Sequence, residues 1–210
     1  MLLTISKVYL LKKVFSVFFT GLVIKIMDDY LDQDIDILEK EQNLFTAIEY
    51  GGLPYALLLF SLAFILDPVT SLSLFFASFA VGMAGNLTVK MPSGLYGYQE
   101  SIIVVLLGFI FFKINMASSL FIIITIQLWD DFLDYDKDKI NKNNLAFLLG
   151  KVECLLLAII FFLLSFYLDY IKAVSSIILM HVIVYIINIL LAKQKYNESN
   201  SLEGKVRNVL

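Results

Sequence analysis

Two stretches of aspartates carry residue types and a spacing that could do chemistry. The sequence reads "DDYLDQDID" from Asp28 and "DDFLDYDKD" from Asp130, and both stretches have aspartate at the first, second, fifth, seventh and ninth positions. Each stretch follows a long apolar run. If a helix continues past each run, aspartates three and four residues apart lie on one face of it.

Carboxylates that share a helix face repel one another unless a cation neutralises them. Their oxygens suit hard divalent ions, and Mg²⁺ typically takes one or two protein carboxylates together with water and substrate phosphate oxygens. Two facing clusters would hold Mg²⁺ around a diphosphate and stabilise the pyrophosphate that leaves an allylic ester. The candidate metal ligands are Asp28, Asp29, Asp32, Asp36, Asp130, Asp131, Asp134 and Asp138. The candidate catalytic residues among them are Asp29, Asp32, Asp131 and Asp134.

A solvated acidic loop at a helix end is the simpler alternative for one such stretch. Negative charge at the C-terminal end of a helix opposes the helix dipole, which argues against this alternative. Two matching stretches, each at the end of an apolar run, favour the metal site over coincidence.

The elements that must position these stretches are membrane helices. The 210 residues are 60% hydrophobic and 17% charged, with a mean hydropathy of +0.83, whereas soluble domains are about half apolar and about a quarter charged. A membrane span needs about 20 apolar residues, with ~17 as a minimum. Apolar runs fall at 8–27, 47–66, 69–86, 99–112, 115–129, 144–166 and 171–192.

These runs predict an all-α, polytopic membrane helix bundle of about seven transmembrane helices. Residues 99–129 are interpreted as two helices, because a single helix would place Lys113 and Asn115 at mid-membrane. We expect one transmembrane domain over residues 1–193 and a polar cytoplasmic tail over residues 194–210.

The lysines predict the orientation of the bundle. With seven helices, both acidic stretches, residues 87–98 and the C-terminal tail share one side, which carries more lysine than the other side. The positive-inside rule makes that side cytoplasmic. We therefore expect an integral protein of the cell membrane, surrounded by lipid, with its acidic stretches on the cytoplasmic side and without a nucleic-acid partner.

The paired stretches resemble the motifs of the UbiA superfamily of intramembrane prenyltransferases. The first family motif is N-D-x-x-D-x-x-x-D, which "DDYLDQDID" matches with Asp28 in place of the asparagine. The second is D-x-x-x-D or D-x-x-D-x-x-x-D, which "DDFLDYDKD" matches through Asp130 or Asp131, Asp134 and Asp138. "YGYQESIIVVLLG" at 96–108 is similar to a stretch of the 1,4-dihydroxy-2-naphthoate branch, and "NNLAFLLG" resembles the family's "RTLPVLLG". The resemblance covers most of residues 14–192.

This resemblance implies a UbiA-like helix bundle and a prenyltransferase, an enzyme that transfers alkyl groups other than methyl. Such an enzyme would move a prenyl group from an isoprenyl diphosphate to a lipophilic acceptor, aromatic acceptors included, with Mg²⁺ as cofactor. The chain differs from the usual family pattern in two ways. It has seven apolar runs where the family usually has nine helices, and Asn143 and Asn144 stand where an arginine is expected.

Four further polar residues are candidates for substrate binding. Lys25 lies one turn before Asp29, so it could reach diphosphate oxygens or simply pair with Asp29. Lys90 resembles the basic position after the fourth family helix, and Lys142 lies close to the place of the missing arginine. Asn86 could line the pocket or cap a helix end.

Three other functions remain open. A membrane terpene cyclase of the UbiA type would use the same metal site without an acceptor. Soluble isoprenyl diphosphate synthases share the D-D-x-x-D pattern, but the hydropathy of this chain argues against that class. A non-catalytic or ion-transporting relative is the third alternative, although transporter sites usually lie near the membrane midplane rather than at helix ends.

Overall fold

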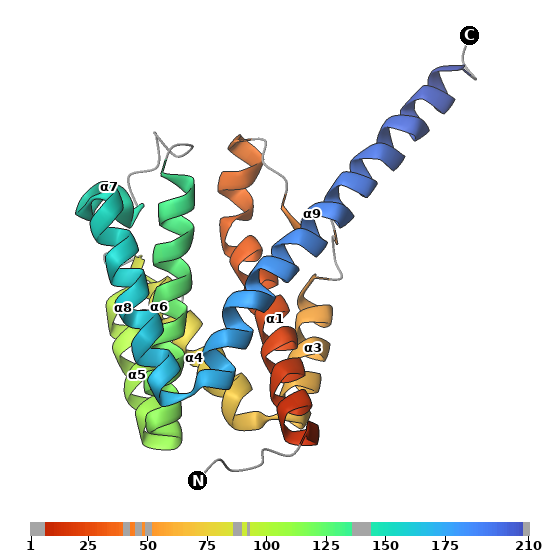
Figure 1. Ribbon diagram of the computed structural model, residues 1–210. Coiled ribbons are helices and arrows are strands. Elements are labelled where there is room, and N and C mark those ends of the chain that lie inside the picture. The colour runs from red at the N-terminus through yellow and green to blue at the C-terminus, as the bar shows by residue number, and fades with distance from the viewer. Residues whose placement is uncertain are drawn as a thin grey trace.

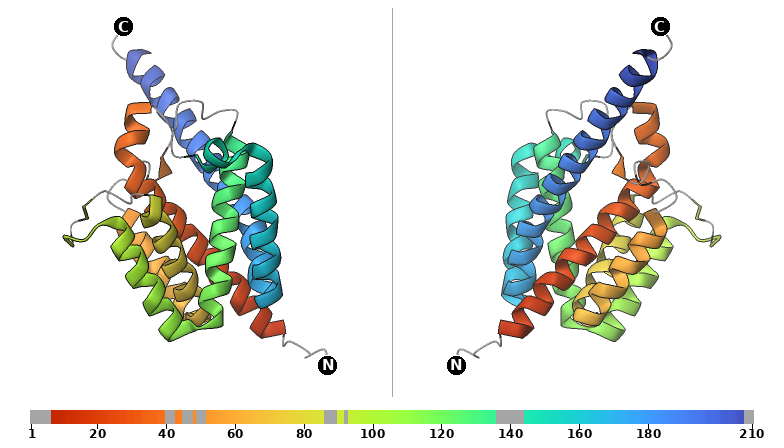
Figure 2. Two further views of the ribbon diagram at one scale, coloured as in Figure 1. Left: turned by 90° about the vertical axis from the view of Figure 1, so that its left-hand side faces the viewer. Right: turned by 90° about the vertical axis from the view of Figure 1, so that its right-hand side faces the viewer.

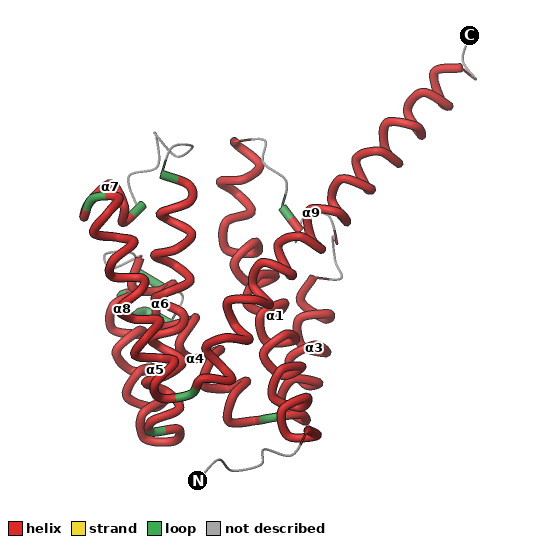
Figure 3. Tube along the Cα trace, in the orientation of Figure 1, coloured by secondary structure: helices red, strands yellow, loops and turns green. Residues whose placement is uncertain are grey.

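The computed structural model describes residues 7–39, 43–44, 48, 52–85, 90–91, 93–135 and 144–207, with side chains except at 32–39, 84–85 and 194–207. Over this part the chain is all-helical (Figure 3), which confirms the predicted all-α class. The helices are α1 (Lys7–Glu39), α3 (Gly52–Leu66), α4 (Pro68–Gly85), α5 (Gly97–Phe112), α6 (Ile114–Asp134), α7 (Leu145–Leu149), α8 (Lys151–Leu168) and α9 (Tyr170–Arg207).

Helices α1, α6 and α9 all run in the same direction through the bundle (Figure 1). They start near the end of the molecule that holds the N-terminus, and α1 and α6 both finish at the opposite end. The described parts of the two acidic stretches therefore lie at the same end of the bundle, as the sequence predicts. Helix α9 continues through the polar C-terminal segment as far as Arg207 and projects beyond the other helices (Figure 2).

Among the residues that the structure describes, three helices are long and apolar enough to cross a membrane: Ile114–Asp134, Lys151–Leu168 and Tyr170–Lys193. Three shorter apolar helices accompany them: Gly52–Leu66, Pro68–Met83 and Gly97–Phe112. Large apolar side chains on their outer faces are exposed, among them Leu57, Ile65, Phe111, Leu163 and Tyr185. An apolar outer surface of this kind is stable when lipid covers it. Three of the predicted spans are thus supported by length and composition.

Small residues fill the contacts between helices. Ser73, Ser118, Ser119 and Ser165 are fully or almost fully buried, and the Ser119 hydroxyl donates to Ser73 Oγ at 2.8 Å. Ser165 on α8 likewise donates to the carbonyl oxygen of Ser118 on α6 at 3.0 Å. Small and hydroxyl-bearing residues let helix backbones approach closely and hydrogen-bond across the interface, which is the usual packing of helices in membranes.

Two residues with a positive φ angle, Lys113 and Gly150, separate consecutive helices. Lys113 has φ +50° and separates α5 from α6, so residues 99–129 form two helices, as predicted. Gly150 has φ +106° and separates α7 from α8. The expectation of a single helix over the apolar run at 144–166 is therefore wrong. The backbone at Gly150 has a positive φ that cannot continue a helix.

The bundle contains an internal repeat of helix pairs. Helix α1 packs along α3, and α6 packs along α8, each pair antiparallel and joined by a segment that follows an acidic stretch. Helix α4 lies beside both α1 and α6, and α9 packs mainly on α1. The helices that carry the two acidic stretches, α1 and α6, thus hold equivalent places.

A buried cluster of charged side chains, Lys13, Asp169 and Lys172, lies at the end of the bundle away from the acidic stretches. Lys13 Nζ on α1 lies 2.6 Å from Asp169 Oδ2, just before α9. Lys172 is fully buried, and its ammonium group donates to the Asn115 carbonyl oxygen and to Ser119 Oγ, both at 2.9 Å. Its Nζ is 4.0 Å from Asp169 Oδ2. One carboxylate thus lies between two buried ammonium groups from different helices.

Candidate active site

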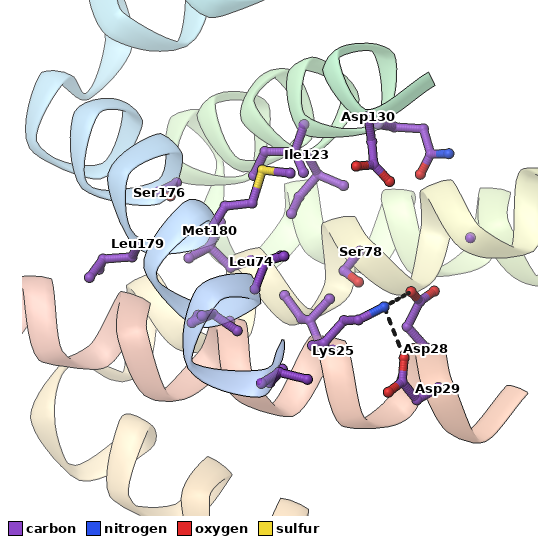
Figure 4. Close-up of a pocket in the computed structure, with 18 of the residues that line it drawn as sticks. Lys25, Asp28, Asp29, Leu74, Ser78, Ile123, Asp130, Ser176, Leu179 and Met180 are labelled. Carbon is purple, nitrogen blue, oxygen red and sulfur yellow. Dashed lines mark hydrogen bonds and ion pairs between the residues drawn. The ribbon is translucent and has the colours of Figure 1, made fainter. Parts of the chain in front are cut away.

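A cavity of about 530 Å³ lies between α1, α4, α6 and α9. Both acidic stretches contribute to its wall: Asp28 and Asp29 come from α1, and Asp130 and Asp134 come from α6. Lys25 lies beside them (Figure 4). The structure thus brings together five of the residues that the sequence singled out, although more than ninety positions separate the two stretches.

The rest of the cavity is mainly apolar and extends toward the opposite end of the bundle. Its wall there includes Val17 and Leu74, with Ser176 and Met180 contributed by α9 (Figure 4). Val17 and Asp29 are twelve residues apart on α1, which corresponds to about 18 Å at a rise of about 1.5 Å per residue. The cavity therefore has an anionic end and an apolar end separated by several helical turns.

Lys25 neutralises part of the first acidic stretch. Its Nζ lies 2.8 Å from Asp29 Oδ1 and 3.4 Å from Asp28 Oδ2 (Figure 4). The Asp28 side chain is 59% exposed whereas that of Asp29 is 9% exposed. The lysine therefore bridges an inward-facing carboxylate that is accessible from the cavity and a buried one.

Asp29 also binds the segment that follows α1. Its Oδ2 accepts the backbone N–H of Leu44 at 2.8 Å, and its carbonyl oxygen accepts the Asn43 side-chain amide at 2.6 Å. We call these two hydrogen bonds the first clasp. Both oxygens of the Asp29 carboxylate thus have protein partners, Lys25 on one and Leu44 on the other.

Asp131 makes the same pair of hydrogen bonds in the second half of the chain. Its Oδ2 accepts the backbone N–H of Leu145 at 3.1 Å, and its carbonyl oxygen accepts the Asn144 side-chain amide at 3.1 Å. We call this pair the second clasp. Asp131 is absent from the described wall of the cavity, which Asp130 and Asp134 line instead.

The other predicted site residues are placed less fully. Asp32 and Asp36 belong to α1, but their side chains are outside the described part. Asn86, Asp138 and Lys142 lie outside the described residues altogether. Lys90 is exposed and pairs through its backbone with Tyr96, and it is not among the described residues that line the cavity.

Four polar residues of the cavity wall were not predicted. They are Ser78 on α4, Gln127 on α6, and Ser176 and Asn188 on α9. Gln127 stands four residues before Asp131, as Lys25 stands four before Asp29, so the internal repeat could have identified it. Ser78 and Asn188 have no such signal, because only the packing of α4 and α9 against the other helices brings them to the cavity.

The oxygen donors of the cavity suit Mg²⁺ in their chemistry. Within the described side chains, no group of three or more histidine, cysteine, aspartate or glutamate residues lies close enough to hold a metal ion. Mg²⁺ commonly uses only one or two carboxylates and completes its shell with water and phosphate oxygens. Asp28, Asp130 and Asp134 are carboxylates of that kind, and Lys25 already places a cation beside the first of them.

No family model, no curated protein and no solved structure matches the chain.

Proposed function

We propose that the protein is a prenyltransferase of the UbiA type, which transfers a prenyl group from an isoprenyl diphosphate to a lipophilic acceptor within the membrane. One observation carries this proposal. Asp28 from the first acidic stretch and Asp130 and Asp134 from the second line a single cavity whose remaining wall is largely apolar. A substrate with an anionic head and an apolar tail complements both parts of that cavity.

The diphosphate head belongs at the acidic end, although carboxylates alone would repel it. Bound Mg²⁺ would neutralise this repulsion and the charge that develops on the leaving pyrophosphate. Asp28, Asp130 and Asp134 would hold the ion, since they reach the cavity from two helices. Lys25 can donate to a phosphate oxygen in exchange for its contact of 3.4 Å with Asp28.

The prenyl tail belongs in the apolar part. The wall there is built from side chains such as Leu74, Ile123, Met180 and Ile183. These side chains exclude water, and so they protect an allylic cation until the acceptor attacks it. Gln127 and Asn188 line the same cavity and can orient a hydroxyl or carbonyl group of the acceptor.

The acidic end is proposed to face the cytoplasm of the cell membrane. The lysine distribution along the sequence supports this orientation. Cysteine labelling of the intact cell at Gln42 and Asn143 tests it, because the two positions follow the two acidic stretches. Labelling of the two positions from opposite sides of the membrane would contradict both the orientation and a shared site.

An assay of pyrophosphate release tests the reaction. The purified full-length chain is incubated with geranyl, farnesyl or geranylgeranyl diphosphate, with Mg²⁺ or with EDTA, and with or without membrane lipid extract. We expect release that requires both Mg²⁺ and the extract. Release without the extract would indicate cyclisation or hydrolysis instead of transfer, and no release with any of the three substrates would contradict the proposal.

A further inference from the structure

The two clasps suggest a role for the second aspartate of each acidic stretch that differs from metal binding. In each stretch the first aspartate, Asp28 or Asp130, is exposed and lines the cavity. The second aspartate is less accessible: Asp29 is buried and Asp131 is half-buried. Each second aspartate directs one carboxylate oxygen to a backbone N–H of the segment that follows its helix.

We propose that Asp29 and Asp131 are positioning residues, which bind the segment that follows α1 or α6 and thereby present Asp28 and Asp130 to the cavity. Successive residues of a helix point about 100° apart, since there are about 3.6 residues per turn. When the side chain of Asp29 or Asp131 points toward the segment that follows its helix, the side chain of the preceding aspartate therefore points away from that segment. Asp28 and Asp130 both line the cavity. Asp29 also reaches the cavity wall, but Lys25 and Leu44 already bind its two carboxylate oxygens.

The hydrogen-bond requirements of a helix end explain the second clasp. Asp131 lies within the last four residues of α6, whose carbonyl groups lack partners inside the helix. The Asn144 amide satisfies the Asp131 carbonyl oxygen, and the Asn144 Oδ1 accepts the N–H of Ala146 at 2.8 Å. Asn144 thus hydrogen-bonds to the last turn of α6 and caps the N-terminus of α7. Leu44, held by the first clasp, is buried against Val23, Ile26 and Ile187.

The role of a positioning aspartate depends on an acceptor oxygen and not on a negative charge. Asparagine keeps an acceptor oxygen at the same place, whereas alanine removes it. A metal-binding aspartate, by contrast, loses its function when its charge is removed. Substitution by asparagine therefore separates the two roles, and Asp131 is the better position because Asp29 also lines the cavity beside Lys25, whereas Asp131 is absent from the described wall.

The first measurement is amide hydrogen exchange of the full-length chain in detergent, without metal or substrate. We expect Asp131→Ala to speed exchange at Leu145, and Asp29→Ala to speed exchange at Leu44, by about tenfold or more, the scale of a lost hydrogen bond to a charged group. Asp131→Asn should retain the slow exchange of the unchanged protein. Slow exchange in both alanine variants would overturn the proposal.

The second measurement is the Mg²⁺-dependent rate of pyrophosphate release, and this arm rests on the proposed function. We expect Asp131→Asn to keep kcat within about threefold and Asp130→Asn to lower it about 100-fold, the scale of a lost electrostatic group in a transition state. If Asp131→Asn kept slow exchange but lost as much kcat as Asp130→Asn, Asp131 would act through its charge, which would overturn the positioning role. A chain without any pyrophosphate release would refute the proposed function, and the exchange data would then decide the positioning role alone.

Discussion

Asp29 and Asp131 occupy equivalent places in two copies of one structural unit. Each is the second aspartate of its stretch, and each binds the Asn–Leu pair that follows, Asn43–Leu44 or Asn144–Leu145. The same unit thus recurs on α1 and on α6. Because the two helices run in the same direction, the units meet at one end of the bundle and open onto one cavity.

If the two stretches form one site, Asp28→Asn and Asp130→Asn should not have additive effects. Each substitution alone should lower kcat for pyrophosphate release by about 100-fold, and the double variant should be hardly worse than either single variant. Residues that act as a unit behave this way because removing one member already disables the unit. Steady-state kinetics of the three variants measures this, with Glu153→Gln, an exposed acid on α8, as the control. Fully additive losses would indicate two independent sites.

Lys25 should contribute to diphosphate binding more than Lys90 does. Lys25 lines the cavity next to Asp28, whereas Lys90 is exposed and is not among the described residues of the cavity wall. We expect Lys25→Met to raise KM for the isoprenyl diphosphate about tenfold, which corresponds to ~1.4 kcal/mol. Lys90→Met, the matched control, should leave KM unchanged. An unchanged KM for Lys25→Met, with a lower Mg²⁺ requirement, would mean that Lys25 only pairs with the carboxylates.

Asp169 should be essential for stability rather than for the reaction. Asp169→Ala would leave Lys13, which is 6% exposed, and the fully buried Lys172 without their carboxylate partner. Breaking a buried ion pair typically costs about 3–5 kcal/mol. Thermal denaturation in detergent should therefore show a clearly lower midpoint for Asp169→Ala. Lys12→Ala, next to Lys13 but exposed, is the control; equal midpoints for the two variants would contradict the importance of this cluster.

Ser176 should limit the length of the prenyl chain. Its hydroxyl is buried at the apolar end of the cavity and has no hydrogen-bond partner among the described residues. Ser176→Leu would fill that end and displace the last part of a long tail. Lost burial of two CH₂ groups, at about 0.8 kcal/mol each, corresponds to about tenfold weaker binding. We therefore expect KM to rise for geranylgeranyl diphosphate and not for geranyl diphosphate.

The control for this prediction is Ser176→Ala, which removes the unsatisfied hydroxyl without adding volume. It should not lower the thermal midpoint, because a buried polar group without a partner does not stabilise the fold. If Ser176→Leu raised KM equally for all three diphosphates, the tail would not extend to this end of the cavity.

Most of the fold could be predicted from hydropathy. The long apolar runs correspond to helices, and Lys113 divides α5 from α6 as expected. The break at Gly150 was missed, because the left-handed conformation of one glycine leaves no mark on an apolar pattern. Hydropathy could not predict that α1 extends to Glu39 and α9 to Arg207, because the last part of each helix is polar.

The candidate site could be predicted only in part. The order of the apolar runs correctly placed both acidic stretches on one side of the bundle, where Asp28 and Asp130 line one cavity. The spacing could not separate Asp130 from Asp131, because their different roles depend on where the returning chain lies. Ser78 and Asn188 escaped for a related reason: a single polar residue in an apolar helix does not reveal which neighbour it faces.

We propose that both acidic stretches act together on one diphosphate. The most direct test of this claim is equilibrium binding of a non-cleavable farnesyl diphosphate analogue to the purified full-length chain. This measurement does not depend on the identity of the acceptor. We predict saturable binding with Mg²⁺, loss of binding with EDTA, and loss of binding with Mg²⁺ in both Asp28→Asn and Asp130→Asn. Equal binding with Mg²⁺ and with EDTA, or unchanged binding in either variant, would contradict the claim.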